Sequence, residues 1–175
     1  MTKKYKKKDI DALVDSIIVI VDTREKQCNH ILKCFDKYNI KYKRQKLLSG
    51  DYSCIIPPNE EIGFEGMDLT NEIAVERKRN LEEISTNLST KKKQFKNEFE
   101  RFKGKIFIVI ENNTYKDLAV YNYNTKLLPK QFLGLLHSFV YDHDSPFIFV
   151  DEEVSALLIY NLLKYYFKNK IKNTE

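Results

Sequence analysis

The sequence predicts an α/β fold, in which a mixed central β-sheet is flanked by helices. Short apolar runs at 17–21, 105–110 and 147–150 are rich in Ile, Val and Phe, which is typical of strands buried on both faces. Segments with helical spacing of apolar residues separate and follow the last two runs. Because strand and helix patterns alternate through the second half of the chain, we expect helices to cover a mixed sheet.

The other elements are expected from local patterns along the chain. A basic tail at 3–8 comes first, and the polar stretch 59–71 is expected to be a loop because Pro57-Pro58 ends the strand before it. Further strands are expected at 39–45, 47–56 and 72–78, and helices at 9–16, 27–38, 80–88, 91–102, 129–141 and 152–169.

Length and composition limit the possible classes of protein. The 175 residues suit one domain at 17–175, preceded by a basic tail and short helix at 1–16, and a core of this size needs no metal or disulfide to fold. Three cysteines without a C-x-x-C pair indicate a reducing compartment. Since no apolar run approaches the roughly 20 residues of a membrane span and no apolar region follows the first lysines, we expect a cytoplasmic protein that is neither secreted nor membrane-bound.

Positive charge is concentrated in a few segments. The net charge of +5 equals the charge of the five lysines in residues 1–8, so the rest of the chain is neutral on average. Two basic stretches remain, at 41–46 and 91–105. Such segregation is typical of a surface that binds a polyanion, although solvated helix faces would give the same pattern. The candidate residues for binding a nucleic acid in the second stretch are Lys91, Lys92, Lys93, Lys96 and Arg101, and Arg24, outside both stretches, is a further candidate.

Acidic residues occur in three clusters at the expected strands. Asp22 to Glu25 directly follow the first strand, Gly50-Asp51 lies in the third, and Glu76-Arg77-Lys78 ends the fourth. Side chains alternate along a strand, so Glu76 and Lys78 share one face and Arg77 lies on the other. If residues 47–56 pair antiparallel with 72–78, Asp51 faces Glu76, and two carboxylates and an ammonium meet in one place.

This combination suits the hydrolysis of a phosphodiester. Carboxylate oxygens can hold one or two Mg²⁺ ions, which neutralise phosphate charge and lower the pKa of a bound water. A lysine beside them can orient the water or stabilise developing negative charge. A surface strand with an ordinary Glu–Lys pair gives the same spacing, so both interpretations stay open at this point.

The order Val-Asp-Thr-Arg-Glu at 21–25, Gly50-Asp51 and Glu76-Arg77-Lys78 resembles the nuclease domain of the XPF family of structure-specific endonucleases, within the PD-(D/E)xK nuclease group. The resemblance covers about residues 17–150 and implies a restriction-endonuclease-like core. It departs from the family signature at Glu82, where the family has Asp, and at Gln94, in a loosely comparable segment where the family has arginine. The family's helix-hairpin-helix module and helicase domain are not expected in this chain.

The resemblance implies roles for the motif residues. Asp51 and Glu76 are expected to be the core metal ligands, and Asp22 to join them directly or through water. Glu25 is expected behind these ligands or at a second metal, and Lys78 is expected to be the catalytic lysine. The family treats Arg77 as essential, and an ion pair with Glu82 or Glu25 is its expected contact. Arg24 is expected to contact phosphate or to form a salt bridge.

The implied activity is that of a Mg²⁺-dependent endodeoxyribonuclease that cuts branched, flapped or junction DNA in repair, recombination or DNA processing. Mn²⁺ is expected to substitute for Mg²⁺, and no nucleotide triphosphate is expected because no phosphate-binding G-x-x-x-x-G-K-[ST] motif is present. A homodimer through C-terminal helices is expected, with residues 152–169 as one candidate. A non-catalytic DNA-binding or dimerisation partner and a sequence-specific restriction-like enzyme are the alternatives. Tyr121-Asn122-Tyr123 lies in a polar loop and is interpreted either as core packing or as a surface that stacks on a base.

Overall fold

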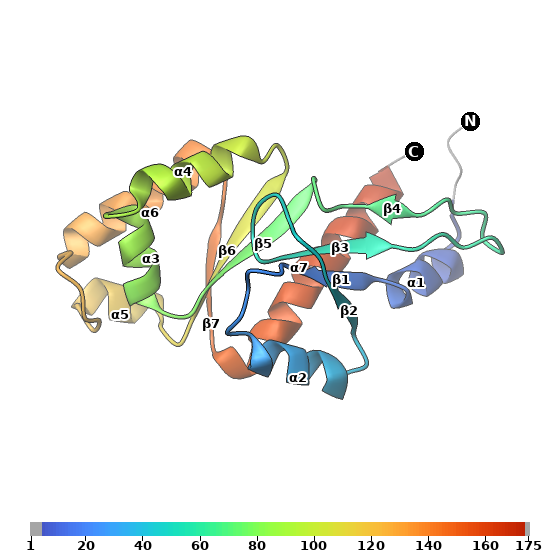
Figure 1. Cartoon of the computed structure of the whole chain (residues 1–175), viewed down its shortest axis with the longest axis horizontal. Coiled ribbons are helices and arrows are strands. Elements are labelled where there is room, and N and C mark those ends of the chain that lie inside the picture. The colour runs from blue at the N-terminus through green and yellow to red at the C-terminus, as the bar shows by residue number, and fades with distance from the viewer. Residues whose placement is uncertain (1–4, 174–175) are drawn as a thin grey trace.

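The centre of the protein is a twisted mixed sheet (Figure 1). The computed structural model describes residues 5–173, whose seven strands lie in the order β2-β1-β3-β5-β6-β7, with β4 paired to β3. β1 is parallel to β2 and antiparallel to β3, β3 is antiparallel to β5, and β5, β6 and β7 are parallel. The strands are β1 (Ile18–Val21), β2 (Lys41–Arg44), β3 (Tyr52–Ile56), β4 (Met67–Asp68), β5 (Ile73–Lys78), β6 (Lys105–Glu111) and β7 (Phe147–Val150).

Helices cover both faces of this sheet, so the predicted fold class is confirmed. One hydrophobic core combines residues of α1, α2 and α7 with one face of the sheet, and a second core combines residues of α3, α4, α5 and α6 with the other face. The helices are α1 (Lys7–Asp15), α2 (Asn29–Lys37), α3 (Leu81–Leu88), α4 (Lys92–Arg101), α5 (Tyr115–Val120), α6 (Pro129–His143) and α7 (Glu152–Asn173).

β5 contributes to both cores because its side chains alternate between the faces. Ile73 and Val75 belong to the core under α7, and Ala74 belongs to the core under α3 and α4. All six residues of the strand are buried, including three charged ones, Glu76, Arg77 and Lys78. A buried charge is stable only when it is paired or bound to a metal. The end of β5 is therefore the place where the fold must supply partners.

α7 covers the sheet with a stripe of buried side chains. Its buried positions recur every three or four residues, and are Ser155, Ala156, Ile159, Leu163, Phe167 and Ile171. Leu158, Leu162 and Tyr166 also pack against this core as partly buried side chains, whereas Val154 and Tyr165 are 48% and 55% exposed.

Several short elements differ from expectation. Residues 47–51 form a loop with bends at 48–51 rather than part of β3. β4 arises inside the expected 59–71 loop, and α5 arises where no element was expected. α1 begins at Lys7, inside the expected basic tail, while Lys3 and Lys4 lie outside the described residues. No helix within 5–173 is both long and apolar enough to cross a bilayer.

Candidate active site at the end of β5

Asp51 is held against β5 by backbone pairing. The antiparallel register places Tyr52 opposite Val75, and the Asp51 amide donates to the Val75 carbonyl at 2.9 Å. Oδ2 of Asp51 accepts a hydrogen bond from the backbone N–H of Arg77 at 2.8 Å. The predicted antiparallel pairing is therefore confirmed, and it brings the Asp51 carboxylate to the strand that carries Glu76 and Lys78.

Gly50 makes this close approach possible. Its φ of +74° lies in the left-handed region that side chains other than glycine rarely adopt. A Cβ at this position would lie 2.8 Å from the Cβ of Ala74 and 3.2 Å from the carbonyl oxygen of Val75. The glycine thus lets the 47–51 loop lie directly on β5, next to the small side chain of Ala74.

Glu76 and Lys78 form a buried ion pair on the face of β5 that lies under α4. Lys78 Nζ lies 2.5 Å from Glu76 Oε1. The side chain of Lys78 is 7% exposed and that of Glu76 is 8% exposed. The prediction that they share one face is confirmed. Burial lowers the pKa of Lys78, but the charges of Glu76 and Asp51 outweigh it and the net pKa is raised. Lys78 is therefore an ammonium donor at neutral pH rather than a base.

Asp51 carries the opposite perturbation. Burial and the nearby charge of Glu76 raise the pKa of the Asp51 carboxyl well above its ordinary value, although the ammonium of Lys78 opposes them. Two like charges in a poorly solvated place repel each other, and one ammonium does not balance both. The site therefore favours an additional cation.

Asp22 lies beside this cluster, but hydrogen bonds to Arg24 and Leu47 use both of its carboxylate oxygens. Oδ1 accepts from the backbone N–H and Nε of Arg24 at 2.7 and 2.8 Å, and Oδ2 accepts from the Leu47 amide at 2.6 Å and from Arg24 Nη2 at 3.1 Å. Burial raises the pKa of Asp22, but these hydrogen bonds outweigh it and the net pKa is lowered. The Asp22 carboxylate thus fixes the 47–51 loop, and Arg24 forms the salt bridge that was one of its two expected contacts.

Arg77 points to the opposite face of β5, as the alternation predicts, and is the centre of a buried network. Its Nη1 lies 2.6 Å from Glu111 Oε2, and its Nη2 lies 3.1 Å from Glu25 Oε1 and donates to the Gln27 carbonyl at 2.6 Å. His30 Nε2 lies 3.0 Å from the other oxygen of Glu111. The ion pair with Glu25 confirms one of the two expected partners. Glu82 bonds instead to the Asn124 amide.

Glu98 on α4 is a carboxylate near the cluster that the sequence did not single out. Ser49 Oγ donates to the Glu98 carbonyl at 2.9 Å, which ties α4 to the 47–51 loop. Burial and the charge of Glu76 raise the pKa of the Glu98 carboxyl, while Lys78, Arg24 and a hydrogen bond with the Gly50 backbone oppose the rise. The sequence gives little indication of this role, because Glu98 lies in a segment with seven lysines and arginines. Phe95 and Phe99 of the same helix point into the core, and the position of Glu98 beside them is the one signal that it lies near the sheet.

Comparison with known proteins assigns the chain to a family. The family model of the ERCC4 domain matches residues 21–162, which include every motif described above. The chain belongs to the ERCC4 domain family. No curated protein sequence matches the chain significantly.

Solved structures share the fold of this ERCC4 domain. XPF from Aeropyrum pernix superposes with a TM-score of 0.63 at 16% identity, over 86% of this chain and 65% of that one. XPF from the same organism in complex with DNA gives 0.62 at 17% identity, over 87% and 66%. The chain thus spans about two thirds of the length of these structures, and the likeness concerns the fold.

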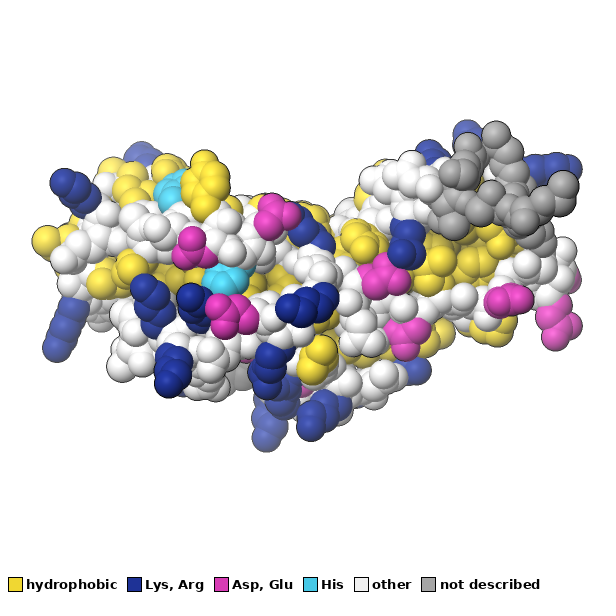
Figure 2. All heavy atoms as spheres, turned by 90° about the horizontal axis from the view of Figure 1, so that it is seen from above, with side chains coloured by type: hydrophobic (Ala, Val, Ile, Leu, Met, Phe, Trp, Pro, Cys, Tyr) yellow, Lys and Arg dark blue, Asp and Glu magenta, His cyan; other side chains and the backbone are white. Residues whose placement is uncertain are grey.

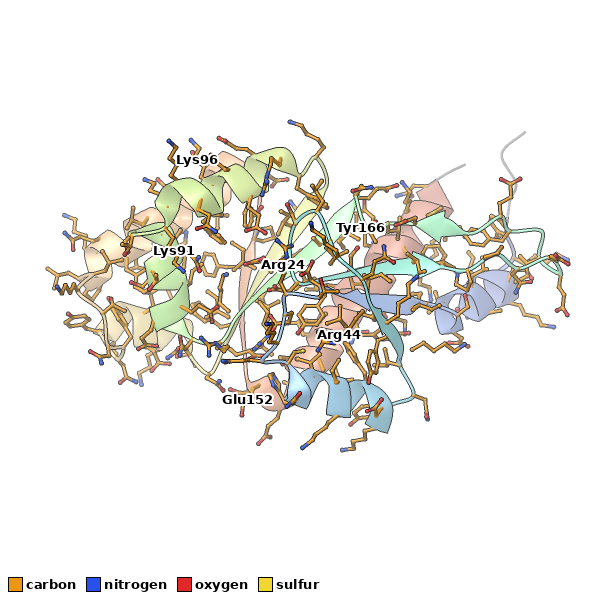
Figure 3. All side chains as sticks on the ribbon, in the orientation of Figure 1. Arg24, Arg44, Lys91, Lys96, Glu152 and Tyr166 are labelled. Atoms are coloured by element: carbon orange, nitrogen blue, oxygen red, sulfur yellow. The ribbon has the colours of Figure 1, made fainter. Side chains whose placement is uncertain are left out.

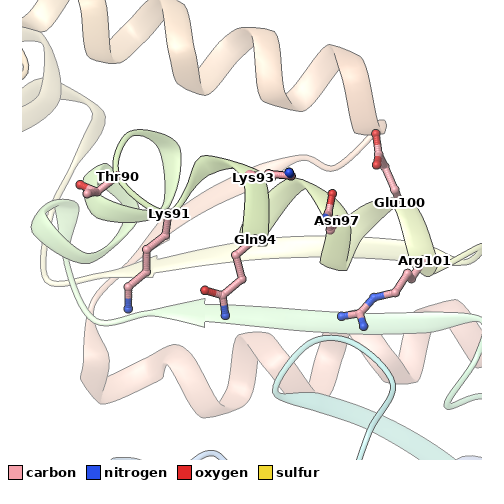
Figure 4. A pocket seen from close by; sticks show the side chains of 7 residues that line it. All are labelled: Thr90, Lys91, Lys93, Gln94, Asn97, Glu100 and Arg101. Atoms are coloured by element: carbon pink, nitrogen blue, oxygen red, sulfur yellow. The ribbon is translucent and has the colours of Figure 1, made fainter.

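One group of basic residues of the ERCC4 domain lies on α4 and beside it. Lys and Arg side chains are numerous on the half of the molecule that holds α4 (Figure 2). In the view of Figure 3, Arg24 appears between α4 and Arg44 of β2. A groove of about 920 Å³ runs along α4, where Lys91, Gln94 and Arg101 point to one side (Figure 4).

The five expected DNA-binding residues of α4 and its start divide into two groups. Lys91, Lys93 and Arg101 line this groove. Lys92 and Lys96 are exposed outside its lining, and Lys96 pairs with Glu100 at 3.5 Å. Lys91 also lines a neighbouring cavity that contains Lys78, so the basic face reaches the carboxylate cluster.

The donor set of the ERCC4 domain suits a hard divalent cation. Asp51 and Glu76 supply carboxylate oxygens, and within residues 5–173 no hydrogen bond is formed by Oδ1 of Asp51 or by Oε2 of Glu76. No three His, Cys, Asp or Glu side chains in that part of the chain come together as a complete metal site. Mg²⁺ commonly takes one or two protein carboxylates and completes its shell with water and phosphate oxygens, so two carboxylates fit its chemistry.

Proposed function

We propose that this ERCC4 domain is a metal-dependent endonuclease that hydrolyses phosphodiester bonds of branched, flapped or junction DNA. The observation that carries the proposal is the meeting of Asp51, Glu76 and Lys78 at the end of β5, where two carboxylates repel and one ammonium is fixed. The family and the fold shared with XPF, one structure of which is a complex with DNA, support the choice of substrate.

Asp51 and Glu76 would hold the cation, with Glu98 close enough to add charge. Bound Mg²⁺ or Mn²⁺ would supply a Lewis acid that neutralises phosphate charge and lowers the pKa of water. Lys78 donates hydrogen bonds to oxygen atoms on which negative charge develops, and Glu76 holds it in place. Asp22 and Arg77 act on the geometry of this site, since their charged groups are paired elsewhere.

Sequence-independent binding would come from contacts to phosphate. Lys91, Lys93 and Arg101 in the groove along α4 can neutralise phosphates without reading bases. Selectivity for branches would then depend on where the DNA bends or opens at the site. A sequence-specific enzyme would need contacts to base edges, which these phosphate-binding side chains do not by themselves supply.

The test is cleavage of labelled fork, flap, four-way-junction and linear duplex DNA with Mg²⁺, Mn²⁺ or EDTA. We expect metal-dependent cutting near the branch, and a loss of at least about 100-fold in rate for Asp51→Asn and for Lys78→Ala. Lys116→Ala, on the exposed surface of α5, is the matched control and should keep full activity. Binding without cleavage by the wild-type chain would favour a non-catalytic partner, and cutting at one fixed sequence in linear duplex would favour a restriction-like enzyme.

We propose that the chain forms a homodimer through the free edge of the sheet with α5 and α6 beside it, rather than through the expected residues 152–169. β7 pairs only with β6 among the described strands, and its four residues are half-buried. The ring centroid of Phe147 lies 5.5 Å from that of His137 on α6 and 6.5 Å from that of Tyr115 on α5, whose ring is parallel to it. Tyr115 is 46% exposed. Sedimentation should therefore give twice 20.8 kDa for the wild type and for Tyr38→Glu at the end of α2, but a monomer for Tyr115→Glu. A wild-type monomer at micromolar concentration would contradict this interface.

A further inference from the structure

We propose that Tyr121 is a stacking platform for an unpaired nucleobase beside the cleavage site. The inference rests on the proposed function, because it assigns to the same DNA substrate a second contact, made to a base rather than to phosphate. Tyr121 follows α5 at its C-terminal cap and is 45% exposed.

The backbone of Tyr121 is unusual for this residue type. Its φ is +63° and its ψ +37°, in the left-handed region. Three other residues of 5–173 that are not glycine have positive φ, and they are Asn39, Asn112 and Asp144, types that tolerate this conformation. An aromatic residue is disfavoured here, so an asparagine or glycine would fit the turn better. The fold therefore keeps this ring at a conformational cost.

The ring of Tyr121 is held in one orientation. Its hydroxyl donates to the Thr125 carbonyl at 3.1 Å, and its ring meets that of Tyr123 edge to face at 5.0 Å. Tyr123 in turn packs on the buried Phe132 at 5.3 Å and donates to the Leu127 carbonyl at 2.9 Å. An exposed aromatic ring that is already ordered loses little conformational entropy when a flat ligand stacks on it.

The loop that follows Tyr121 is bonded to a residue of the cavity lined by Lys78, the catalytic lysine candidate. The amide of Asn124, in the same loop, donates to Glu82 Oε1 at 2.7 Å. Glu82 lines a cavity of about 420 Å³ together with Lys78, Arg79 and Lys91. Cationic side chains beside an ordered aromatic ring are the combination that binds single-stranded nucleic acid, through phosphate contacts and base stacking. Only an unpaired base offers its face to such a ring, and branched DNA supplies unpaired bases.

The test is a double-mutant cycle between protein and DNA, measured as binding by fluorescence anisotropy. It uses the Asp51→Asn chain in EDTA, so that no cleavage occurs, and fork DNA with an abasic site placed in turn at each unpaired nucleotide beside the branch. We expect one abasic position to weaken binding by about 5- to 100-fold. Tyr121→Ala should weaken binding of intact DNA equally and be insensitive to that abasic site. Tyr121→Phe keeps the ring but loses the hydrogen bond to Thr125, so it should retain most of the affinity and its sensitivity to the abasic site.

Tyr38→Ala is the matched control, because Tyr38 also caps a helix and is 51% exposed. It should leave both affinities unchanged, and thermal melting should show each variant folded. Additive effects of Tyr121→Ala and every abasic site, or equal losses for Tyr121→Phe and Tyr121→Ala, would overturn the inference. Failure of the proposed function gives a different result. In that case the wild-type chain cuts no DNA in Mg²⁺, while the binding cycle still shows coupling between Tyr121 and one unpaired base.

Discussion

Three consecutive residues of β5 have different tasks because of the direction in which each side chain points. Glu76 and Lys78 pair with each other on one face, and Arg77 pairs with Glu111 and Glu25 on the other. All three are buried, so each charge depends on its partners. Substitutions at these residues should therefore separate effects on activity from effects on stability.

Replacement of Arg77 should mainly cost stability. Arg77→Ala leaves Glu111 buried without its guanidinium partner, and breaking such a buried pair costs about 3 to 5 kcal/mol of the free energy of unfolding. Arg77→Lys should recover part of this loss, since lysine lacks the fork that reaches both glutamates. Urea denaturation measures both. Arg79→Ala is the control, because the exposed Arg79–Glu83 pair should contribute about 1 kcal/mol or less.

Replacement of Glu98 should cost activity while leaving the fold intact. Glu98→Gln removes negative charge near Glu76 and Lys78, so we expect a higher Mg²⁺ concentration at half-maximal cleavage and a rate lower by about 10-fold or more. Glu153→Gln, at the exposed start of α7, is the control and should cleave normally. Equal metal requirements for the two variants would show that Glu98 has no part in the site.

At the scale of elements, the 47–51 loop decides where Asp51 lies. Gly50→Ala introduces a Cβ that would lie 2.8 Å from the Cβ of Ala74, at a φ of +74°. We expect a loss of about 1 to 3 kcal/mol in stability together with a large loss of cleavage, because the loop must move away from β5. Gly134→Ala on α6 is the matched control, since a Cβ there would have no neighbouring atom within 4 Å. That variant should be equally or more stable.

The sequence was sufficient for the elements with strong periodicity. The runs around Val19 and Ile108 were predicted as strands, and the alternation at 72–78 correctly separated Glu76 and Lys78 from Arg77. The loop containing Asp51 was wrongly assigned to a strand, because its position depends on a positive φ and on contacts with Asp22 and Arg77. Glu111 and Glu98 were missed because only the packed sheet and α4 bring them to β5.

For the whole molecule, the buried carboxylates predict how stability depends on pH. The pKa of Asp51 is raised in the folded chain by burial and by Glu76, so above about pH 4 the folded state binds more protons than the unfolded state. Stability of the metal-free protein should therefore fall as the pH rises through the window between the ordinary and the raised pKa. Asp22, whose net pKa is lowered despite burial, acts in the opposite direction at lower pH.

Thermal melting in EDTA across pH 4 to 9 tests this slope. Asp51→Asn should flatten it and raise the melting temperature at pH 8 by about 3 °C, because like-charge repulsion is removed. Added Mg²⁺ should stabilise the wild type at pH 8 and have little effect on Asp51→Asn. A wild type that melts at the same temperature with and without Mg²⁺ would contradict a cation site at Asp51.

The alternation along β5 also limits which mutations the chain can accept during evolution. A deletion of one residue between Ile73 and Val75 would turn the rest of the strand over, since the side-chain period is two. Arg77 would then enter the carboxylate cluster, and Glu76 and Lys78 would enter the network around Glu111. The two faces of this strand can therefore diverge independently through substitution, whereas an insertion or deletion in it would destroy both at once.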